Sequence, residues 1–270
     1  MTIYFMNTIL DEIVSHKKEE VKLRKQKGIS DLKESEMFFR TPISLRSALL
    51  ETKLSIGVIA EIKRKSPSAG IIREDFSAKE IAKEYEENSA SAISVLTDER
   101  YFGGSLNDLE NVRNVVSIPL LRKDFIIDQV QIYEAKSFGA DAILLIADIL
   151  SRQQLEDLFF CAKENGLECL VEVYKPHSLE KINFDEMRLL GINNRNLKTM
   201  KVNLKHTEEI ISFLPKDICV VSESGIKTSE DVLRVKNYGA KAILIGETLM
   251  KEKSPGKALK ELVEGCTGKI

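Results

Sequence analysis

The chain has 270 residues, of which 43% are hydrophobic and 30% charged, and this is enough apolar material for one large core. Lysine and arginine total 40 and aspartate and glutamate total 42, so the formal net charge is only −2. That balance gives no electrostatic basis for binding nucleic acid or a membrane surface, and no segment approaches the length of a membrane span.

The first fifty residues precede the first predicted strand. Residues 8–27 have the apolar periodicity of one amphipathic helix, and we expect its many basic side chains to form a solvated face. Thr41-Pro42 predicts the start of a second short helix, with proline at the first helical position. An appended segment of this kind can close one end of a barrel or cover a ligand.

From residue 56 onward, short β-rich runs alternate with amphipathic helical runs. The predicted strands are 56–62, 92–96, 119–122, 142–146, 168–173, 189–191, 218–222 and 242–245. The predicted helices are 78–88, 106–116, 128–138, 151–164, 175–182, 204–213, 229–238 and 257–264. Four of the helices have candidate N-caps, namely Ser77, Asp128, Ser151 and Ser229.

The strand cores are continuous apolar runs, which are typical of parallel strands covered by helices on the outside. Residues 138–144 and 238–244 are near copies in which a glycine ends a helix before the next strand. The eightfold alternation predicts an α/β protein, a closed (β/α)8 TIM barrel with an N-terminal helical extension. The alternative is a doubly wound open sheet, but its Gly-rich first turn is absent because Gly70 stands alone. We expect a single domain over 1–270, with 1–50 as the extension.

The remaining composition predicts a soluble cytoplasmic protein. The cysteines form no Cys-x-x-Cys pair and suit buried thiols in a reducing compartment; they are Cys161, Cys169, Cys219 and Cys266. The histidines lie far apart in polar segments, so we expect them at the surface and expect no metal site; they are His16, His177 and His206. Residues 1–10 lack the basic start, long apolar stretch and cleavage site of an export signal.

Several predicted strands end in charged or amide side chains, where a barrel holds its active site. Glu61 and Lys63 alternate onto one face of their strand. Arg64 and Lys65 are better explained as solvated residues. Four further strands end in polar side chains that are candidates for the same site, namely Lys123, Glu172, Asn193 and Glu223.

Some of these side chains have a simpler structural explanation. Lys123 could pair with its neighbour Asp124, Asn193 could hold a turn, and Glu223 could cap a helix. Glu172 has apolar residues on both sides, and a parallel barrel strand has no solvent edge, so a functional role is favoured there.

Two segments after the last two strands have the features of a phosphate site. Residues 222–226 precede a helix, and residues 244–248 follow the eighth strand and lead into a short helical stretch. Loops at these places in a barrel often bind phosphate through backbone N–H groups, and glycine allows close approach. Ser66 in the first loop is a possible third donor.

Six ordered motifs together resemble the indole-3-glycerol phosphate synthase family. They are EIKRKSPS (61–68), LTDERYFGGS (96–105), LRKDF (121–125), LVEV (170–173), GINNRNL (191–197) and SESGI (222–226). The resemblance extends from the N-terminal helix to about Met250. It implies a carboxy-lyase of tryptophan biosynthesis that needs no metal or organic cofactor. The implied substrate is the phosphosugar 1-(2-carboxyphenylamino)-1-deoxyribulose 5-phosphate, which closes to an indole ring and loses carbon dioxide and water.

The resemblance also implies roles for individual residues. Lys123 resembles the general acid for ring closure, Glu172 the acid/base residue of dehydration, and Lys63 a second cation that helps hydroxide to leave. How these three share the later proton transfers stays open. The residues that would orient the substrate and its lysines are Glu61, Asn193 and Glu223. Arg195 matches a residue near the anthranilate carboxylate, and the phosphate region comprises Ser66, Ser224, Gly225, Gly246 and Glu247.

Position 247 departs from the family pattern, since small hydroxyl residues are common there. If only the Glu247 backbone faces the phosphate, function survives, whereas a carboxylate facing it would weaken binding.

Two alternative functions share part of this pattern. Phosphoribosylanthranilate isomerase has a similar phosphate site but uses a Cys/Asp pair where this chain has Glu61 and Asn193. A barrel that binds a phosphorylated ligand as a sensor or assembly subunit would not require both lysines and Glu172. Association with other tryptophan-pathway enzymes remains open.

Overall fold

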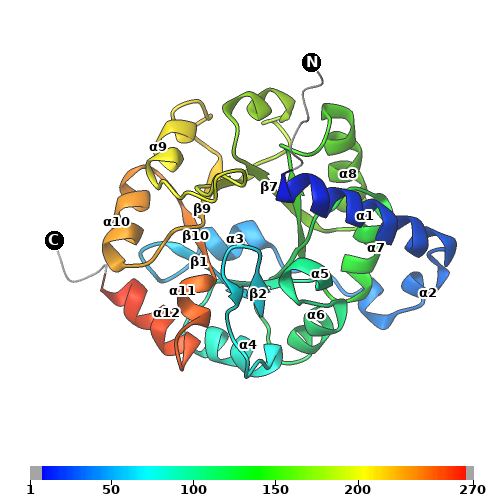
Figure 1. The fold of residues 1–270 in the computed structure, drawn as a ribbon, viewed down its shortest axis with the longest axis horizontal. Coiled ribbons are helices and arrows are strands. Elements are labelled where there is room, and N and C mark those ends of the chain that lie inside the picture. Colours follow the sequence, from blue (N-terminus) through cyan, green and yellow to red (C-terminus); the bar gives the residue numbers. More distant parts are fainter. Residues whose placement is uncertain (1–7, 266–270) are drawn as a thin grey trace, which may run out of the picture.

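The computed structural model describes residues 8–265, in which eight parallel strands close into a barrel surrounded by helices (Figure 1). Around the ring the order is β1, β10, β9, β8, β7, β6, β5, β4 and back to β1. The strands are β1 Gly57–Ile62, β4 Ala92–Leu96, β5 Leu120–Lys123, β6 Ala142–Ile146, β7 Glu168–Val173, β8 Leu189–Asn193, β9 Cys219–Glu223 and β10 Ala242–Ile245. The closed (β/α)8 barrel is therefore confirmed, and the open-sheet alternative is excluded.

The helices between the strands cover the outside of the barrel. They are α4 Ala78–Glu87, α6 Leu106–Arg113, α7 Gln129–Ser137, α8 Arg152–Glu164, η2 Pro176–Lys181, α9 Lys205–Ile211, α10 Ser229–Asn237 and α12 Pro255–Glu264. The fifth of them is a 3₁₀ helix and not an α-helix. Ser77, Asp128 and Ser151 are N-caps as predicted. Ser229 was the wrong choice, because Thr228 accepts from the Asp231 N–H and Asp231 bonds back to it in a capping box.

Several short elements complete the chain. They are α2 Ser30–Lys33, η1 Glu36–Phe39, α3 Leu45–Leu50, the hairpin strands β2 Lys65–Ser66 and β3 Gly70–Ile71, α5 Glu99–Phe102 and α11 Glu247–Met250. The short helical stretch after the eighth strand, α11, was predicted from the sequence, and so was a second short helix in the extension, although not its start. The expected helix start at Thr41-Pro42 is wrong. Ser44 caps α3 and accepts from the Ser47 N–H, so the helix begins at Leu45.

The interior of the barrel is filled from below by α3 and by inward-facing strand residues. Leu45 and Leu49 of α3 pack with Ile59 of β1, Leu121 of β5 and other interior side chains. Outward-facing residues pack in a second core between strands and helices. One part of the extension therefore closes the amino end of the barrel.

Because side chains alternate along a strand, the polar residues at the carboxyl ends lie on the same inward-facing side as the apolar residues two positions before them. Ile59 is followed on its own face by Glu61 and Lys63, and Leu121 by Lys123. Leu170 precedes Glu172, Val221 precedes Glu223, and Leu244 precedes Gly246 in the same way. The period of two thus sets an apolar layer directly beneath a charged one.

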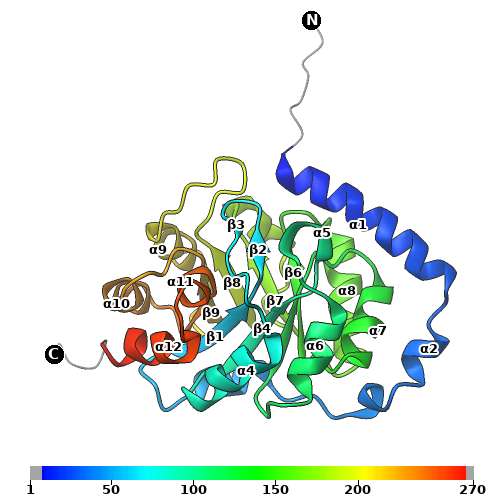
Figure 2. The same ribbon diagram turned by 60° about the horizontal axis from the view of Figure 1, so that its bottom comes forward.

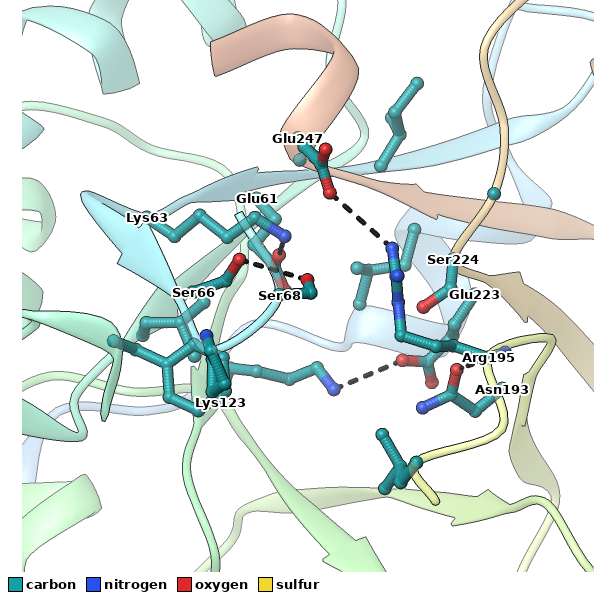
Figure 3. Close-up of a pocket in the computed structure, with 18 of the residues that line it drawn as sticks. Glu61, Lys63, Ser66, Ser68, Lys123, Asn193, Arg195, Glu223, Ser224 and Glu247 are labelled. Carbon is teal, nitrogen blue, oxygen red and sulfur yellow. Dashed lines mark hydrogen bonds and ion pairs between the residues drawn. The ribbon is translucent and has the colours of Figure 1, made fainter. Parts of the chain in front are cut away.

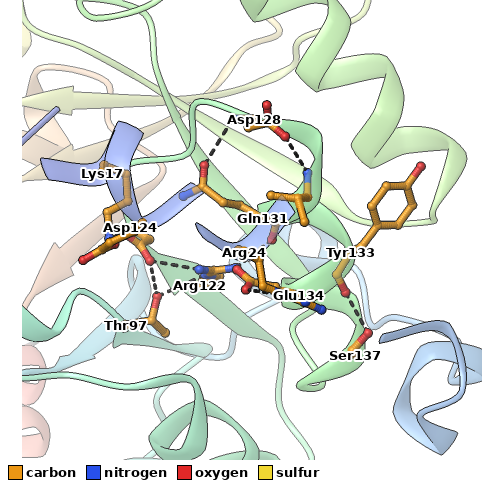
Figure 4. Close-up of polar contacts among 12 residues, drawn as sticks. Lys17, Arg24, Thr97, Arg122, Asp124, Asp128, Gln131, Tyr133, Glu134 and Ser137 are labelled. Carbon is orange, nitrogen blue, oxygen red and sulfur yellow. Dashed lines mark hydrogen bonds and ion pairs between the residues drawn. The ribbon is translucent and has the colours of Figure 1, made fainter. Parts of the chain in front are cut away.

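The N-terminal helix α1, Ile9–Gln26, begins over the mouth of the barrel and runs down its side next to α7 (Figure 2). Our expectation of a solvated basic face is wrong at Lys17, which is only 3% exposed. Its Nζ lies 3.1 Å from Asp98 Oδ2. It also lies 3.0 Å from Oδ1 of Asp124, which Figure 4 shows beside Lys17. Asp124 also accepts from Arg122 and Thr97.

The pKa values of this buried cluster favour its charged forms. Burial would lower the pKa of Lys17, but Asp124 and Asp98 outweigh it and raise the pKa above its ordinary value. Burial would raise the pKa of Asp124, yet Arg122 and Lys17 lower it to about 2. The cluster fastens α1 to the ends of β4 and β5, next to Lys123.

Lys17→Met is expected to lower the free energy of unfolding by about 3–5 kcal/mol, because it leaves two buried carboxylates with less positive charge. Urea unfolding at pH 7 measures this change. The control is Lys22→Met, since Lys22 is exposed on the same helix. Equal, small effects of the two substitutions would contradict a stabilising role for the buried cluster.

The described cysteines are buried as predicted, whereas only one of the three histidines is fully exposed. Cys161, Cys169 and Cys219 are buried as free thiols, and Cys266 lies outside the described part. His177 is exposed, while His16 and His206 are half-buried. Within 8–265 no helix is long and apolar enough to cross a bilayer, and no three His, Cys, Asp or Glu residues are grouped as metal ligands.

Candidate active site

A cavity of about 760 Å³ lies at the carboxyl ends of the barrel strands (Figure 3). All twelve candidate site residues predicted from the sequence line it, although they come from six strands or the loops that follow them. They are Glu61, Lys63, Ser66, Lys123, Glu172, Asn193, Arg195, Glu223, Ser224, Gly225, Gly246 and Glu247.

On one side of the cavity, Lys63 is held by Glu61 from the same strand face. The Lys63 Nζ lies 2.8 Å from Glu61 Oε1, and the Glu61 side chain is almost fully buried. Gly246 makes room for this carboxylate, since a Cβ there would lie 2.6 Å from Glu61 Oε1. The glycine after β10 is therefore required by packing, whatever it contributes to ligand binding.

On the other side, Lys123 forms the centre of a buried charged cluster. Its Nζ lies 2.9 Å from Glu172 Oε2 and 3.2 Å from Glu223 Oε2. Asn193 Nδ2 donates to Glu172 Oε1 over 3.3 Å. The predicted alternative partner, Asp124, instead binds Lys17 and Arg122 on the outside of the barrel. Gly191 leaves space for Glu223, because a Cβ there would collide with its Oε1.

The two acids beside Lys123 have different protonation states. Burial raises the pKa of Glu223 to about 8, and the charge of Glu172 adds to this while Lys123 opposes it. Burial acts the same way on Glu172, but Lys123 and hydrogen bonds bring its pKa below the ordinary value. Burial would also lower the pKa of Lys123, yet Glu172, Glu223 and Glu61 raise it. Near neutral pH the cluster is thus a charged lysine, a carboxylate and a protonated acid.

The raised pKa of Glu223 makes stability depend on pH. Native Glu223 keeps its proton up to about pH 8, whereas the unfolded chain releases it near 4.5. The native state therefore binds more protons between these values, and this contribution to stability falls as pH rises across them. Glu223→Gln removes the contribution. We expect the unfolding free energy of the wild type, relative to Glu223→Gln, to decline from pH 5 to pH 8 in urea titrations.

The matched control for this prediction is Glu208→Gln, on an exposed position of α9. Its difference from the wild type should show no comparable decline over the same pH range. A Glu223→Gln difference that stays constant from pH 5 to pH 8 would contradict a proton held on Glu223.

The end of the cavity formed by the loops after β9 and β10 has an unusual backbone. Ser224 has φ 67° and Gly225 has φ 90°, so two successive residues adopt the left-handed region. Within residues 8–265 no acceptor is recorded for the backbone N–H groups of Gly225 and Ile226. Gly246 precedes α11. In the first loop, Ser66 Oγ accepts from the Ala69 N–H and lies 3.3 Å from Ser68 Oγ.

Glu247 points its carboxylate into the cavity and not away from it (Figure 3). Oε2 lies 3.5 Å from an Arg195 guanidinium nitrogen, and Oε1 lies 2.7 Å from Lys251 Nζ. The hydrogen bond from Lys251, together with the charges of Lys251, Lys63 and Arg195, lowers the pKa of Glu247. Its charge is therefore compensated, which reduces the repulsion that a bound phosphate would meet.

Sequence reasoning missed the apolar wall of the cavity. Ile9, Leu10 and Ile13 of α1 line it, and so do Phe102 and Phe125, whose ring centroids are 6.2 Å apart. The spacing of Ile9 and Ile13 showed an apolar stripe but not what it would face. Apolar walls with a few convergent charges are typical of small-molecule sites, so the extension both closes the barrel and lines its cavity.

The fold and this cavity are those of a (β/α)8-barrel enzyme, because ionisable side chains converge at the carboxyl ends of the strands, where such barrels have their active sites. A model of the indole-3-glycerol phosphate synthase family matches residues 10–262. The chain belongs to the indole-3-glycerol phosphate synthase family, and hence to the decarboxylating lyases of tryptophan biosynthesis.

Individual relatives agree with this assignment. Indole-3-glycerol phosphate synthase from Alkaliphilus metalliredigens is 46% identical over 265 residues, covering 95% of this chain and 98% of its own. The protein of that name from Caldanaerobacter subterraneus is 49% identical over 244 residues, covering 90% and 93%. The solved 3-hexulose-6-phosphate synthase from Salmonella typhimurium superposes with a TM-score of 0.64 at 12% identity, covering 78% and 99%, which supports the fold alone. The predicted family and fold are thus confirmed.

Proposed function

We propose that this chain converts 1-(2-carboxyphenylamino)-1-deoxyribulose 5-phosphate to indole-3-glycerol phosphate, carbon dioxide and water. The observation that carries the proposal is the buried cluster of Lys123 with Glu172 and Glu223, open to a cavity that Lys63 also lines. Family membership indicates the reaction, and these side chains can provide the proton transfers and charge stabilisation that it needs.

Ring closure is the step that needs an acid. The ring carbon that bears the carboxylate attacks the ketone carbon, a C–C bond forms, and the carbonyl electrons move to oxygen. Lys123 donates the proton that this oxygen takes up. The raised pKa of Lys123 keeps it charged when the substrate binds, and a positioned ammonium stabilises the developing alkoxide.

Decarboxylation follows, because the attacked ring carbon now carries both the carboxylate and the new bond. The bond to the carboxylate breaks, its electrons restore the aromatic ring, and carbon dioxide leaves. Arg195 lines the cavity at the end of β8 and is our candidate for holding the carboxylate beforehand. Asn193 orients this region, since its Oδ1 accepts from the Arg195 N–H and its Nδ2 donates to Glu172.

Loss of water completes the indole. The C–O bond breaks as Lys63 delivers a proton to the departing hydroxyl, and Glu172 removes a proton from the neighbouring ring carbon, where the double bond forms. Glu172 suits a base because its lowered pKa leaves it ionised. Glu61 holds Lys63 in position, and Glu223 does the same for Lys123.

The phosphate is proposed to bind between the loops after β9 and β10. The unpaired N–H groups near Gly225, the start of α11 at Gly246 and Glu247, and the hydroxyls of Ser66 and Ser224 support this placement. Binding energy from a group remote from the reacting atoms helps to hold them in register.

We propose one domain over 1–270, with 1–50 as its extension, working in the cytoplasm on a small phosphosugar and needing neither nucleic acid nor membrane. Association with other tryptophan-pathway enzymes is a separate proposal, and co-sedimentation of the purified proteins tests it.

The direct test of the activity is incubation of the purified full chain with the carboxyphenylamino ribulose phosphate, followed by detection of the indole product and of carbon dioxide. Formation of both supports the proposal. Binding without turnover would favour the sensor or assembly alternative. Conversion of phosphoribosylanthranilate would favour the isomerase, although neither Glu61 nor Asn193 matches its Cys/Asp pair.

A further inference from the structure

We infer that Asn194 is a positioning residue for phosphate binding, which it controls from outside the cavity by fixing the peptide between Ser224 and Gly225. The inference rests on the proposed function in one respect, namely that the substrate phosphate binds at this peptide. Asn194 does not line the cavity, and it is the one residue of the Asn193–Arg195 run to which the proposed mechanism gives no role.

Asn194 lies behind the strand ends with its side chain almost completely buried, at 1% exposure. Its Nδ2 donates to Ser222 Oγ over 2.9 Å and to the Ser224 carbonyl over 3.2 Å. Its Oδ1 accepts from Thr207 Oγ1 over 2.8 Å, and the Thr207 and Ser222 hydroxyls lie 2.7 Å apart. Every polar atom of the side chain is therefore engaged, so the amide has one orientation.

The contact with the Ser224 carbonyl fixes more than one atom. No described peptide bond is cis, and in a trans peptide the C=O and the following N–H point in opposite directions. Asn194 holds the Ser224 oxygen on the outer side, so the Gly225 N–H is turned toward the cavity that Ser224 and Gly225 line. That N–H has no recorded acceptor within 8–265 and is available to an anion.

The backbone needs such a restraint. Ser224 is a non-glycine residue at φ 67°, a conformation that persists only where surrounding contacts enforce it. The Asn194 side-chain amide donates to the carbonyl of this peptide. Without it, the peptide is free to rotate and the Gly225 N–H no longer keeps its direction.

Asn194 also connects this peptide to the loop that carries Arg195. Its own N–H donates to the Glu223 carbonyl over 2.8 Å, and its carbonyl accepts from the Asn203 N–H over 3.0 Å. One residue thus sets the relative position of the proposed carboxylate and phosphate contacts.

The test compares Asn194→Ala and Asn194→Asp with the wild type. Asp keeps the size of the side chain and can still accept from the Thr207 and Ser222 hydroxyls. It places a carboxylate oxygen against the Ser224 carbonyl oxygen, however, so that two acceptors face each other and no hydrogen bond forms. We expect KM to rise about tenfold in Asn194→Ala, as for one lost hydrogen bond, with kcat changed less than about twofold. Asn194→Asp should raise KM at least as much.

The affinity for inorganic phosphate, measured by ³¹P NMR titration, should fall in each Asn194 variant by the same factor as KM rises. Anthranilate has the carboxylate but no phosphate, so its inhibition constant should stay unchanged. The matched control is Thr207→Val, which removes a hydrogen bond to Asn194 but keeps the one to Ser224; it should leave KM and phosphate affinity unchanged even if it lowers stability.

Unchanged phosphate affinity in both Asn194 variants would overturn the inference, and so would an equal loss in Thr207→Val. A fall in kcat at constant KM would overturn it as well. If the wild type forms no indole but the Asn194 variants still bind phosphate more weakly than the wild type does, the proposed function is rejected and the role of Asn194 stands, because the phosphate measurement needs no turnover.

Discussion

Lys123→Ala is expected to lower kcat by roughly 10³-fold or more, since it removes both the proton donor and the positive charge at the developing alkoxide. The loss extends to the acids around it. Lys123 is the cation that lowers the pKa of buried Glu172, so its removal favours the protonated form of that carboxyl. The variant thus loses the acid for ring closure and weakens the base for dehydration together.

Carbon dioxide release and indole formation should both stop in Lys123→Ala, because ring closure precedes both. Inorganic phosphate should bind nearly as well as to the wild type, since the loops after β9 and β10 do not depend on Lys123. Thermal unfolding checks that the variant is folded, and Lys236→Ala on an exposed position of α10 is the control. An equal loss of phosphate binding and turnover would refute the assigned role.

Sequence periodicity predicted much of the barrel because each strand repeats one physical pattern. The continuous apolar run of β6, Ala142–Ile146, can only be buried on both faces, and its bounds were predicted correctly. Alternation then places Lys123 above Leu121 without any knowledge of neighbouring strands. The family motifs gave a role in the site to Asn193 and Glu223. From position alone, a structural role was equally plausible for each, as a turn residue for Asn193 and as a helix cap for Glu223.

The misplaced helix starts at Ser229 and Thr41-Pro42 were local errors of one to three residues. The larger error occurred where long-range contacts decide the outcome. Lys17 has a sequence neighbourhood typical of a solvated helix face, yet Asp98 and Asp124 bury it. No local pattern predicts that ion cluster, because the carboxylates lie about eighty or more residues away in the chain. The role of Asn194 depends likewise on a peptide of another loop. The side-chain direction of Glu247 was left open for a similar reason, since one of its two cationic partners, Arg195, lies about fifty residues earlier in the chain.

Glu172→Gln is expected to lower kcat by roughly 10²- to 10⁴-fold, the usual contribution of a general acid–base residue, with a smaller effect on KM. Glutamine keeps the size of the side chain and its contact with Asn193. The charge of Glu172 adds to the burial that raises the pKa of Glu223, so that pKa falls in this variant. Glu223 and Glu61, which also raise the pKa of Lys123, are both kept. The ammonium therefore remains, and ring closure should continue while dehydration slows.

Separate detection of the two products distinguishes Glu172 from Lys123. In a single turnover, Glu172→Gln should release one equivalent of carbon dioxide well before indole appears, whereas Lys123→Ala should release neither. Glu164→Gln, on an exposed position of α8, should behave as wild type. If carbon dioxide and indole slow equally, Glu172 acts before decarboxylation; if neither slows, Glu172 has no part in the chemistry. A pause between the two products is thus the specific consequence of a base that serves only the loss of water.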